Sequence, residues 1–148
     1  MTTTTTRRAL LKAAPLAAAT LALPSAALAA SNSDAAIETA WNRRVEAFSV
    51  YNALPYSEAP GEPYTPEEAA QWAIIDAAED VIRATVATTP EGIAIQLWTQ
   101  FSHSVTARDD EAATQRRDLA HFEAQGDQLD WTERLTIAAL RSLQAMEA

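Results

Sequence analysis

The sequence has no cysteine, three glycines and a single lysine, Lys12, among its 148 residues. Without cysteine there is no disulfide framework, lipoprotein anchor or thiol chemistry. Because the only lysine lies near the N-terminus, the rest of the chain has no candidate for Schiff-base chemistry. Glycine-rich phosphate loops, dinucleotide-binding motifs and nucleophile elbows are also missing. These absences favour a protein that is not an enzyme.

Acidic residues are missing from the N-terminal segment, where none occurs before Asp34. Three cations near the N-terminus are followed by an apolar stretch over residues 13–23 and then by Ala27-Leu28-Ala29. This order is typical of a cleavable secretory signal. The apolar stretch is about half of the ~20 residues that cross a bilayer, so we expect no permanent membrane span. Cleavage before Ala30 divides the chain into a signal over residues 1–29 and one domain over 30–148.

The residues around the cations carry a more specific resemblance. The segment reads Thr-Arg-Arg-Ala-Leu-Leu-Lys, with the key positions Arg7, Arg8, Leu10, Leu11 and Lys12. It resembles the twin-arginine signal, Ser/Thr-Arg-Arg-x-Phe-Leu-Lys, with leucine in place of phenylalanine. The resemblance implies export of a folded domain by the Tat translocon, removal of the signal by signal peptidase, and a periplasmic or secreted product. The alternative is an ordinary Sec signal that contains two arginines.

The remainder of the chain is strongly acidic. From residue 30 onward it contains all twenty acidic residues and eight arginines, a net charge of −12. A nucleic-acid partner is disfavoured because phosphate binding requires a basic face. An anionic membrane surface is disfavoured for the same reason.

Helix caps and apolar periodicity predict an all-α domain of four to five helices after the signal helix, as a small bundle or a long helical hairpin. The predicted helix starts are Ser33, Thr65, Thr89, Asp109 or Asp110, and Asp130. No segment alternates with a period of two, so no sheet is expected. The helices that begin at Thr65 and Thr89 are joined by few residues and should pack antiparallel. Whether the third and fourth predicted helices are one stays open.

The inward faces follow from the spacing of apolar residues. We expect Val86 to extend the inward stripe of the second helix, and Ile93 to begin that of the third. The last helix should be amphipathic through Leu135, Ala138, Ala139, Leu143 and Met146. The four tryptophans should fill gaps between alanine-rich helices, with some reaching a wet edge.

One pair of residues has the spacing of a metal site. Asp118 and His121 are three residues apart on a predicted helix, as in the carboxylate-x-x-histidine pairs of ferritin-like dimetal bundles. Such a bundle needs two pairs and two more carboxylates, and only one pair is present. The alternative is a solvated helix face, and we expect no cofactor. Glu79 lies near an apolar stripe, and Arg83 or an arginine from another helix could neutralise it.

The segment from Pro55 to Tyr64 is rich in proline and is predicted to be a loop. Its tyrosines, Tyr56 and Tyr64, could recognise another protein, or they could fold back onto the bundle. The helix with Trp41 and the Thr-Thr-Pro-x-Gly helix start at residues 88–92 also resemble features of short uncharacterised proteins of alphaproteobacterial type. This resemblance implies no activity. We therefore expect an exported module that binds a protein partner or forms a homodimer. A metal- or cofactor-loaded bundle, exported folded, is the alternative.

Overall fold

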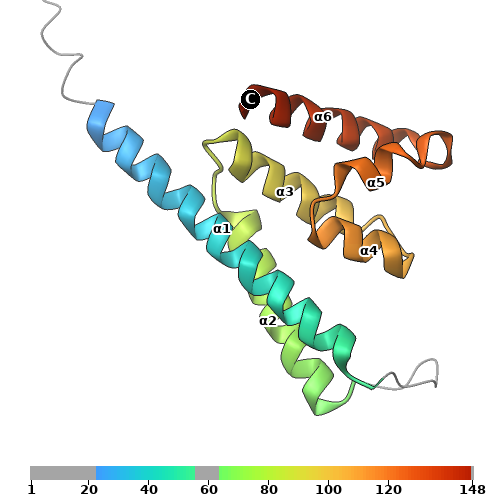
Figure 1. The fold of residues 1–148 in the computed structure, drawn as a ribbon. Coiled ribbons are helices and arrows are strands. Elements are labelled where there is room, and N and C mark those ends of the chain that lie inside the picture. The colour runs from blue at the N-terminus through green and yellow to red at the C-terminus, as the bar shows by residue number, and fades with distance from the viewer. Residues whose placement is uncertain (1–22, 56–63, 148) are drawn as a thin grey trace, which may run out of the picture.

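The structure is a computed structural model that describes residues 23–55 and 64–147. Within these ranges the chain is helical and contains no strand, which confirms the predicted all-α class. The helices pack into a small bundle (Figure 1). Their bounds are α1 Leu23–Ala53, α2 Pro66–Ala84, α3 Pro90–Ser102, α4 Arg108–Gln115, α5 Leu119–Glu123, the 3-10 helix η1 Gly126–Gln128, and α6 Trp131–Glu147.

The first helix is longer than the sequence predicted. α1 begins at Leu23 and continues without a break to Ala53, so the predicted start at Ser33 is wrong. Pro24 lies in the first turn, where the missing N–H removes no helical hydrogen bond and the fixed φ suits the helix. α1 ends before Leu54, as expected from the backbone restriction on a residue that precedes proline.

Local caps set the starts of α2 and α6. At α2, Thr65 accepts a hydrogen bond from the backbone of Glu68 at 3.2 Å, while the Glu68 carboxylate accepts one from the backbone of Thr65 at 2.7 Å. Asp130 and Glu133 make the same reciprocal pair at α6, with both distances 2.8 Å. These capping boxes confirm two predicted starts because all the groups involved lie within four residues.

The third and fourth predicted helices are separate. α3 ends at Ser102, and α4 begins at Arg108 after a short connection. The N-cap of α4 is Ala107, which makes no side-chain cap, so neither Asp109 nor Asp110 caps it. Both carboxylates lie in the first turn instead, where the helix dipole favours an anion.

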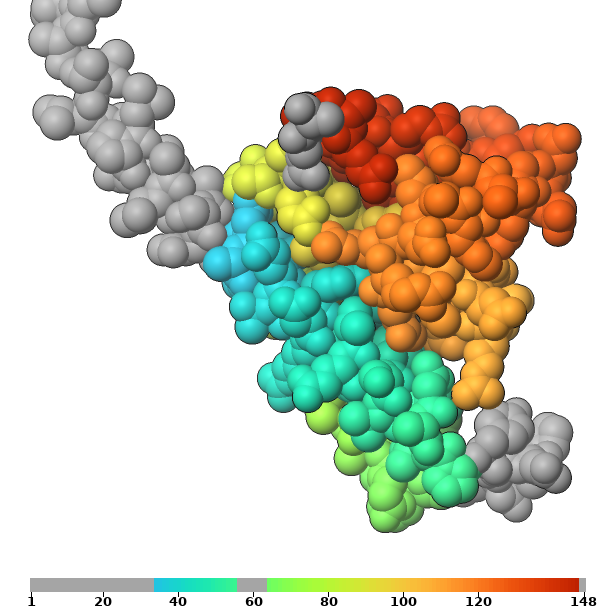
Figure 2. All heavy atoms as spheres, in the orientation of Figure 1, coloured from blue at the N-terminus to red at the C-terminus, as the bar shows by residue number. Residues whose placement is uncertain are grey.

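The helices form two halves that share a core. α1 and α2 pack along each other as a hairpin, and α3 packs against α6, α1 and α4. Figures 1 and 2 show the α1–α2 hairpin on one side and the segments from α3 to α6 on the other. The predicted antiparallel pairing of α2 with α3 is therefore secondary to that of α2 with α1. The reason is that Ile75 packs with Ala47 and Phe48 of α1, whereas Ala78 and Ile82 belong to a core that α1 and α3 share.

Aromatic side chains join the two halves. Trp98, Phe101 and Phe122 form a cluster in which the Phe101 and Phe122 rings are 4.8 Å apart at nearly right angles. Trp41 on α1 belongs to the same buried core. Edge-to-face packing of this kind adds to the stabilisation from burial. Trp131, in contrast, is exposed, so it does not fill the core as the sequence analysis expected.

Candidate functional site

A buried arginine lies beneath the junction of α1, α2 and α3. Arg44 is 1 % exposed, although arginine is among the residues that most rarely lie fully inside a protein. Its Nε donates to Glu79 Oε1 at 2.7 Å, and its Nη2 donates to Ser102 Oγ at 2.6 Å. The guanidinium carbon also lies 5.4 Å from the Trp41 ring and 4.6 Å from the Phe48 ring. Trp41, Arg44 and Phe48 share one face of α1, because their spacing is three and four residues.

Glu79 connects this buried cation to the surface. Its carboxylate is 18 % exposed, and its second oxygen lies 3.0 Å from Nε2 of His103, which is 63 % exposed. The sequence left open whether Arg83 or an arginine from another helix would neutralise Glu79. The structure shows the second arrangement, since Arg83 pairs with Asp80 at 2.5 Å. A carboxylate held from below by a buried guanidinium keeps one orientation toward solvent.

The Arg44–Glu79–His103 chain ends in a cavity between α2 and α3. The cavity has a volume of about 850 Å³. Asp76, Glu79 and Asp80 line it from α2. The α3 wall is polar and neutral, and it is fixed by Gln96, whose amide donates to the backbone oxygens of Ile82 and Thr85 at 2.9 and 2.8 Å. The cavity we call the α2–α3 groove is lined by Asp76, Glu79, Asp80, Ile82, Arg83, Gln96, Thr99, Gln100 and His103.

The predicted metal residues are engaged otherwise. Asp118 is the N-cap of α5 and accepts a hydrogen bond from the backbone N–H of His121 at 3.2 Å. The His121 ring lies 2.7 Å from Asp110 Oδ1, and Gln125 donates to the same oxygen at 2.6 Å. Among the described residues, no group of three or more His, Cys, Asp or Glu side chains could hold a metal ion. Asp118 thus caps α5 through the backbone of His121, and the His121 ring is held by Asp110.

Of the two predicted tyrosines, only Tyr64 lies within the described residues. Its ring is exposed and stacks on Trp72 at 5.9 Å, and Tyr51 and Phe48 contact the same indole. Tyr64 therefore folds back onto the hairpin, as one of the two expectations had it, and its ring remains exposed. Tyr56 lies outside the described residues.

Most of the predicted export residues cannot be placed. The motif at Arg7, Arg8, Leu10, Leu11 and Lys12 lies outside the described part of the chain. The predicted cleavage positions Ala27, Ala29 and Ala30 belong to the first turns of α1. Among the described helices, none is long and apolar enough to span a bilayer.

Asp34 has a role that its neighbours in the sequence do not indicate. Its side chain is buried and binds the segment that precedes α3. Its Oδ1 accepts from the Thr88 backbone at 3.0 Å and its Oδ2 from the Thr88 hydroxyl at 2.8 Å. Burial opposes ionisation of Asp34, but hydrogen bonds from Thr88 and Thr89 outweigh it and lower its pKa from the usual 3.8.

The Asp34 contact also explains the Thr-Thr-Pro-x-Gly pattern at the start of α3. Thr89 is the N-cap and accepts from the Gly92 backbone at 3.1 Å. A Cβ on Gly92 would lie 2.8 Å from Oδ1 of Asp34, which is closer than atoms pack. The pattern thus docks α1 onto the start of α3, and α3 forms one wall of the groove. A buried acid facing Thr-Thr cannot be inferred from spacing, because 54 residues separate the partners.

α6 presents an apolar face to solvent. Thr136, Ile137 and Leu140 are its buried residues, whereas Leu135 and Met146 of the predicted inward face are exposed. The predicted stripe was wrong because both sides of α6 carry apolar residues and only tertiary contacts select the inward one. Val86 and Ile93, also predicted to point inward, are exposed. α2 ends at Ala84, before Val86, and α3 buries Ile95, Trp98 and Phe101 instead of Ile93.

Comparison with known proteins provides no relative for this chain. No protein-family model matches it, and no curated protein or solved structure is significantly similar to it. The α2–α3 groove and the surface of the bundle are therefore the features that bear on function.

Proposed function

We propose that this chain is an exported, non-enzymatic binding module whose α2–α3 groove accepts a cationic side chain of a partner protein. Export is supported by the resemblance of residues 6–12 to a twin-arginine signal. That route would take the folded domain through the Tat translocon into the periplasm, with signal peptidase cutting between Ala29 and Ala30.

The groove is the observation that carries the proposal. Its volume of about 850 Å³ is within the range of pockets that bind small molecules or single side chains. Its α2 wall supplies Asp76, Glu79 and Asp80, whereas Arg83 is its single arginine. Arg44 and Arg83 offset Glu79 and Asp80, so the net negative charge of the groove is that of Asp76, which favours a cation over an anion or an apolar group.

Preorganisation of Glu79 supports the same conclusion. Arg44 fixes Oε1 at 2.7 Å from below, and His103 contacts Oε2. A carboxylate that is already ordered loses little conformational entropy when it meets a ligand. The Thr99 hydroxyl, which lines the groove, donates to the backbone of Ile95, and the nearby Ser102 hydroxyl accepts from Arg44 and donates to the backbone of Thr99. The groove therefore suits binding better than nucleophilic chemistry.

The proposal is tested by titrating the protein, purified from the cells that produce and process it, with an amidated hexa-arginine peptide. The readout is the chemical shifts of the backbone amides in NMR spectra. We expect the largest shifts on the facing sides of α2 and α3, and weaker binding as salt concentration rises. The double variant Asp76→Asn/Asp80→Asn should weaken binding by about 1 kcal/mol, roughly fivefold, because exposed ion pairs contribute up to about 1 kcal/mol each.

A matched control separates a site from general attraction to an acidic protein. The variant Asp109→Asn/Asp127→Asn removes the same charge from exposed positions outside the groove. Binding by this control should equal that of the unmodified protein. Equal weakening by both double variants, or shifts spread over the whole chain, would refute the groove as a site.

The second candidate is a bundle loaded with a metal or cofactor. The contact between Glu79 and His103 favours it, because a carboxylate and an imidazole are common metal ligands. The ligand count does not support it, because among the described residues no group of three or more His, Cys, Asp or Glu side chains could hold a metal ion. Native mass spectrometry distinguishes the two: a bare polypeptide mass favours the binding module, and an added mass lost in His103→Ala or His121→Ala favours the loaded bundle.

A further inference from the structure

The outward face of α6 is an uncovered apolar stripe. Trp131, Leu135 and Met146 are 71 %, 54 % and 71 % exposed. Their spacing of four and eleven residues places them on one side of the helix, because eleven residues make about three turns. Ala138 and Ser142 lie between them on the same side. A continuous exposed stripe of this kind marks an interaction surface more often than isolated apolar residues do.

The stripe is not needed for the core. Thr136, Ile137 and Leu140 already bury the opposite side of α6, which packs against α3 and α5. Figure 1 shows α6 at the edge of the bundle, so its other side is directed away from the remaining described helices. α6 therefore has two largely apolar sides, and the described part of the chain covers one of them.

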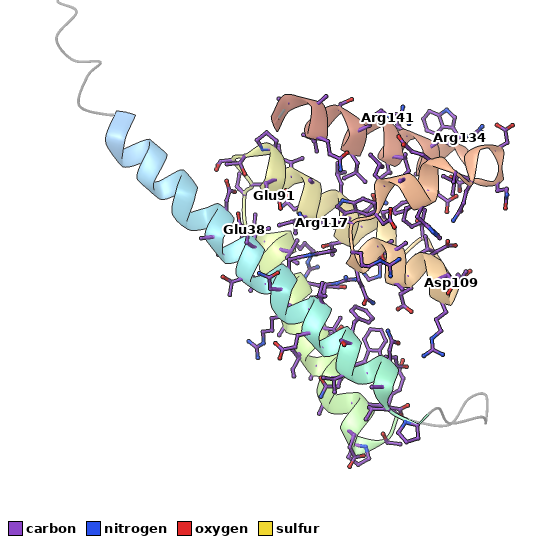
Figure 3. All side chains as sticks on the ribbon, in the orientation of Figure 1. Glu38, Glu91, Asp109, Arg117, Arg134 and Arg141 are labelled. Atoms are coloured by element: carbon purple, nitrogen blue, oxygen red, sulfur yellow. The ribbon has the colours of Figure 1, made fainter. Side chains whose placement is uncertain are left out.

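The charge of α6 indicates which partner fits. Its sequence contains two glutamates and two arginines, a net charge of zero, whereas α2 has five acidic residues and one arginine. Figure 3 shows Arg134 and Arg141 along α6, and each pairs within its own chain, with Asp127 at 3.7 Å and Glu123 at 2.7 Å. Two copies of an acidic chain meet with little repulsion at a neutral face.

The sizes of the side chains are self-complementary. If two copies of α6 run antiparallel about a two-fold axis between Ala138 and Ala139, Trp131 of one faces Met146 of the other. Leu135 then faces Ser142, so a large residue meets a small one. The alanines at the centre let the helix axes approach closely, and a thioether against an indole is a favourable contact.

We infer that α6 is the interface of a two-fold symmetric dimer of this chain, with the two helices antiparallel. The interface is isologous, since each copy contributes the same stripe. The inference does not depend on the α2–α3 groove, which lies on other helices.

Sedimentation equilibrium of the protein, purified from the cells that produce and process it, tests the dimer. The variant Leu135→Glu should raise the dimer dissociation constant by about tenfold or more, because it places an unpaired charge in the interface of each copy. Val50→Glu is the matched control, since it makes the same change at an exposed aliphatic residue of α1 and should leave the constant unchanged. Rising salt should strengthen the dimer by screening the like charges of the copies.

A monomer at every concentration up to about 200 µM would overturn the inference, as would equal effects of the two variants. A stable complex with a different protein in place of the dimer would overturn it too.

Because the chain has no cysteine, single introduced cysteines can report the register. Ala138→Cys places two thiols next to the two-fold axis and should give a disulfide-linked dimer under mild oxidation. Ala145→Cys lies on the same side of α6, but its copies would be about 20 Å apart along antiparallel helices, so no cross-link should form. Equal cross-linking at both positions would indicate parallel helices and refute the antiparallel register.

Discussion

α2 and α6 are helices of similar length, 19 and 17 residues, and each buries one face in the bundle. Both helices bury apolar side chains on their inward sides. These are Ile75 and Ile82 on α2, and Ile137 and Leu140 on α6. Their outward sides differ, because α2 is acidic and lines a groove while α6 is neutral and apolar. The comparison shows that burial explains one face of each helix, and that charge determines what the other face can bind.

The difference predicts opposite responses to salt. Binding of a cation in the groove should weaken as ionic strength rises, whereas pairing of α6 with a second copy should strengthen. One salt series, read by both peptide titration and sedimentation, would therefore show whether the two surfaces act separately. If rising salt changed peptide binding and dimer formation in the same direction, both interactions would involve the same surface.

The largest effect should come from removing the cation beneath α2. Arg44→Met leaves Glu79 without its buried partner and should lower the free energy of unfolding by about 3–5 kcal/mol. Urea denaturation followed by circular dichroism measures the loss. Arg43→Met, an exposed neighbour on α1, is the control and should change stability by less than about 0.5 kcal/mol. Similar losses of stability in both variants would show that the buried pair of Arg44 with Glu79 is not the cause.

A smaller effect should come from the contact that fixes the α3 wall of the groove. Asp34→Asn removes a charge that accepts hydrogen bonds from Thr88 and should cost about 2 kcal/mol at pH 7. Because the folded pKa of Asp34 is lowered, its contribution is present above about pH 4 and is lost as pH falls through that pKa.

The test for Asp34 is a series of urea midpoints between neutral and acidic pH. The gap between Asp34→Asn and the unmodified protein should narrow as the pH falls below about 4. Thr89→Val, which removes the N-cap hydroxyl of α3 but no charge, should give a gap that depends less on pH. A gap for Asp34→Asn that is constant with pH would contradict the assigned role of the carboxylate.

The smallest effect should come from the outward face of α6. Leu135→Gln should change the stability of the monomer by less than about 0.5 kcal/mol, because Leu135 does not contribute to the core. Leu140→Ala on the opposite side should cost about 2–5 kcal/mol. Denaturation at low protein concentration measures both. A large loss from Leu135→Gln would mean that this face is covered within the monomer.

Helix-capping residues made part of the fold predictable from the sequence. The capping boxes at Thr65 and Asp130 and the N-cap at Thr89 placed three helix starts correctly. Ser33 failed as a start because α1 continues through it from Leu23. The α2–α3 groove was harder to predict. The expected position of Glu79 near an apolar stripe was its only indication, and the sequence did not identify the partner of Glu79.

The sequence alone predicts that the domain is helical, that Thr65, Thr89 and Asp130 begin three of the six described α-helices, and that the chain is acidic. These features depend on composition or on residues within four positions of one another. Tertiary packing makes Arg44 the partner of Glu79, brings Asp34 to Thr88 ahead of α3, and selects the buried side of α6. The physical reason is distance along the chain. These contacts join residues 35 and 54 positions apart, and amphipathic periodicity alone cannot choose between two apolar faces of one helix.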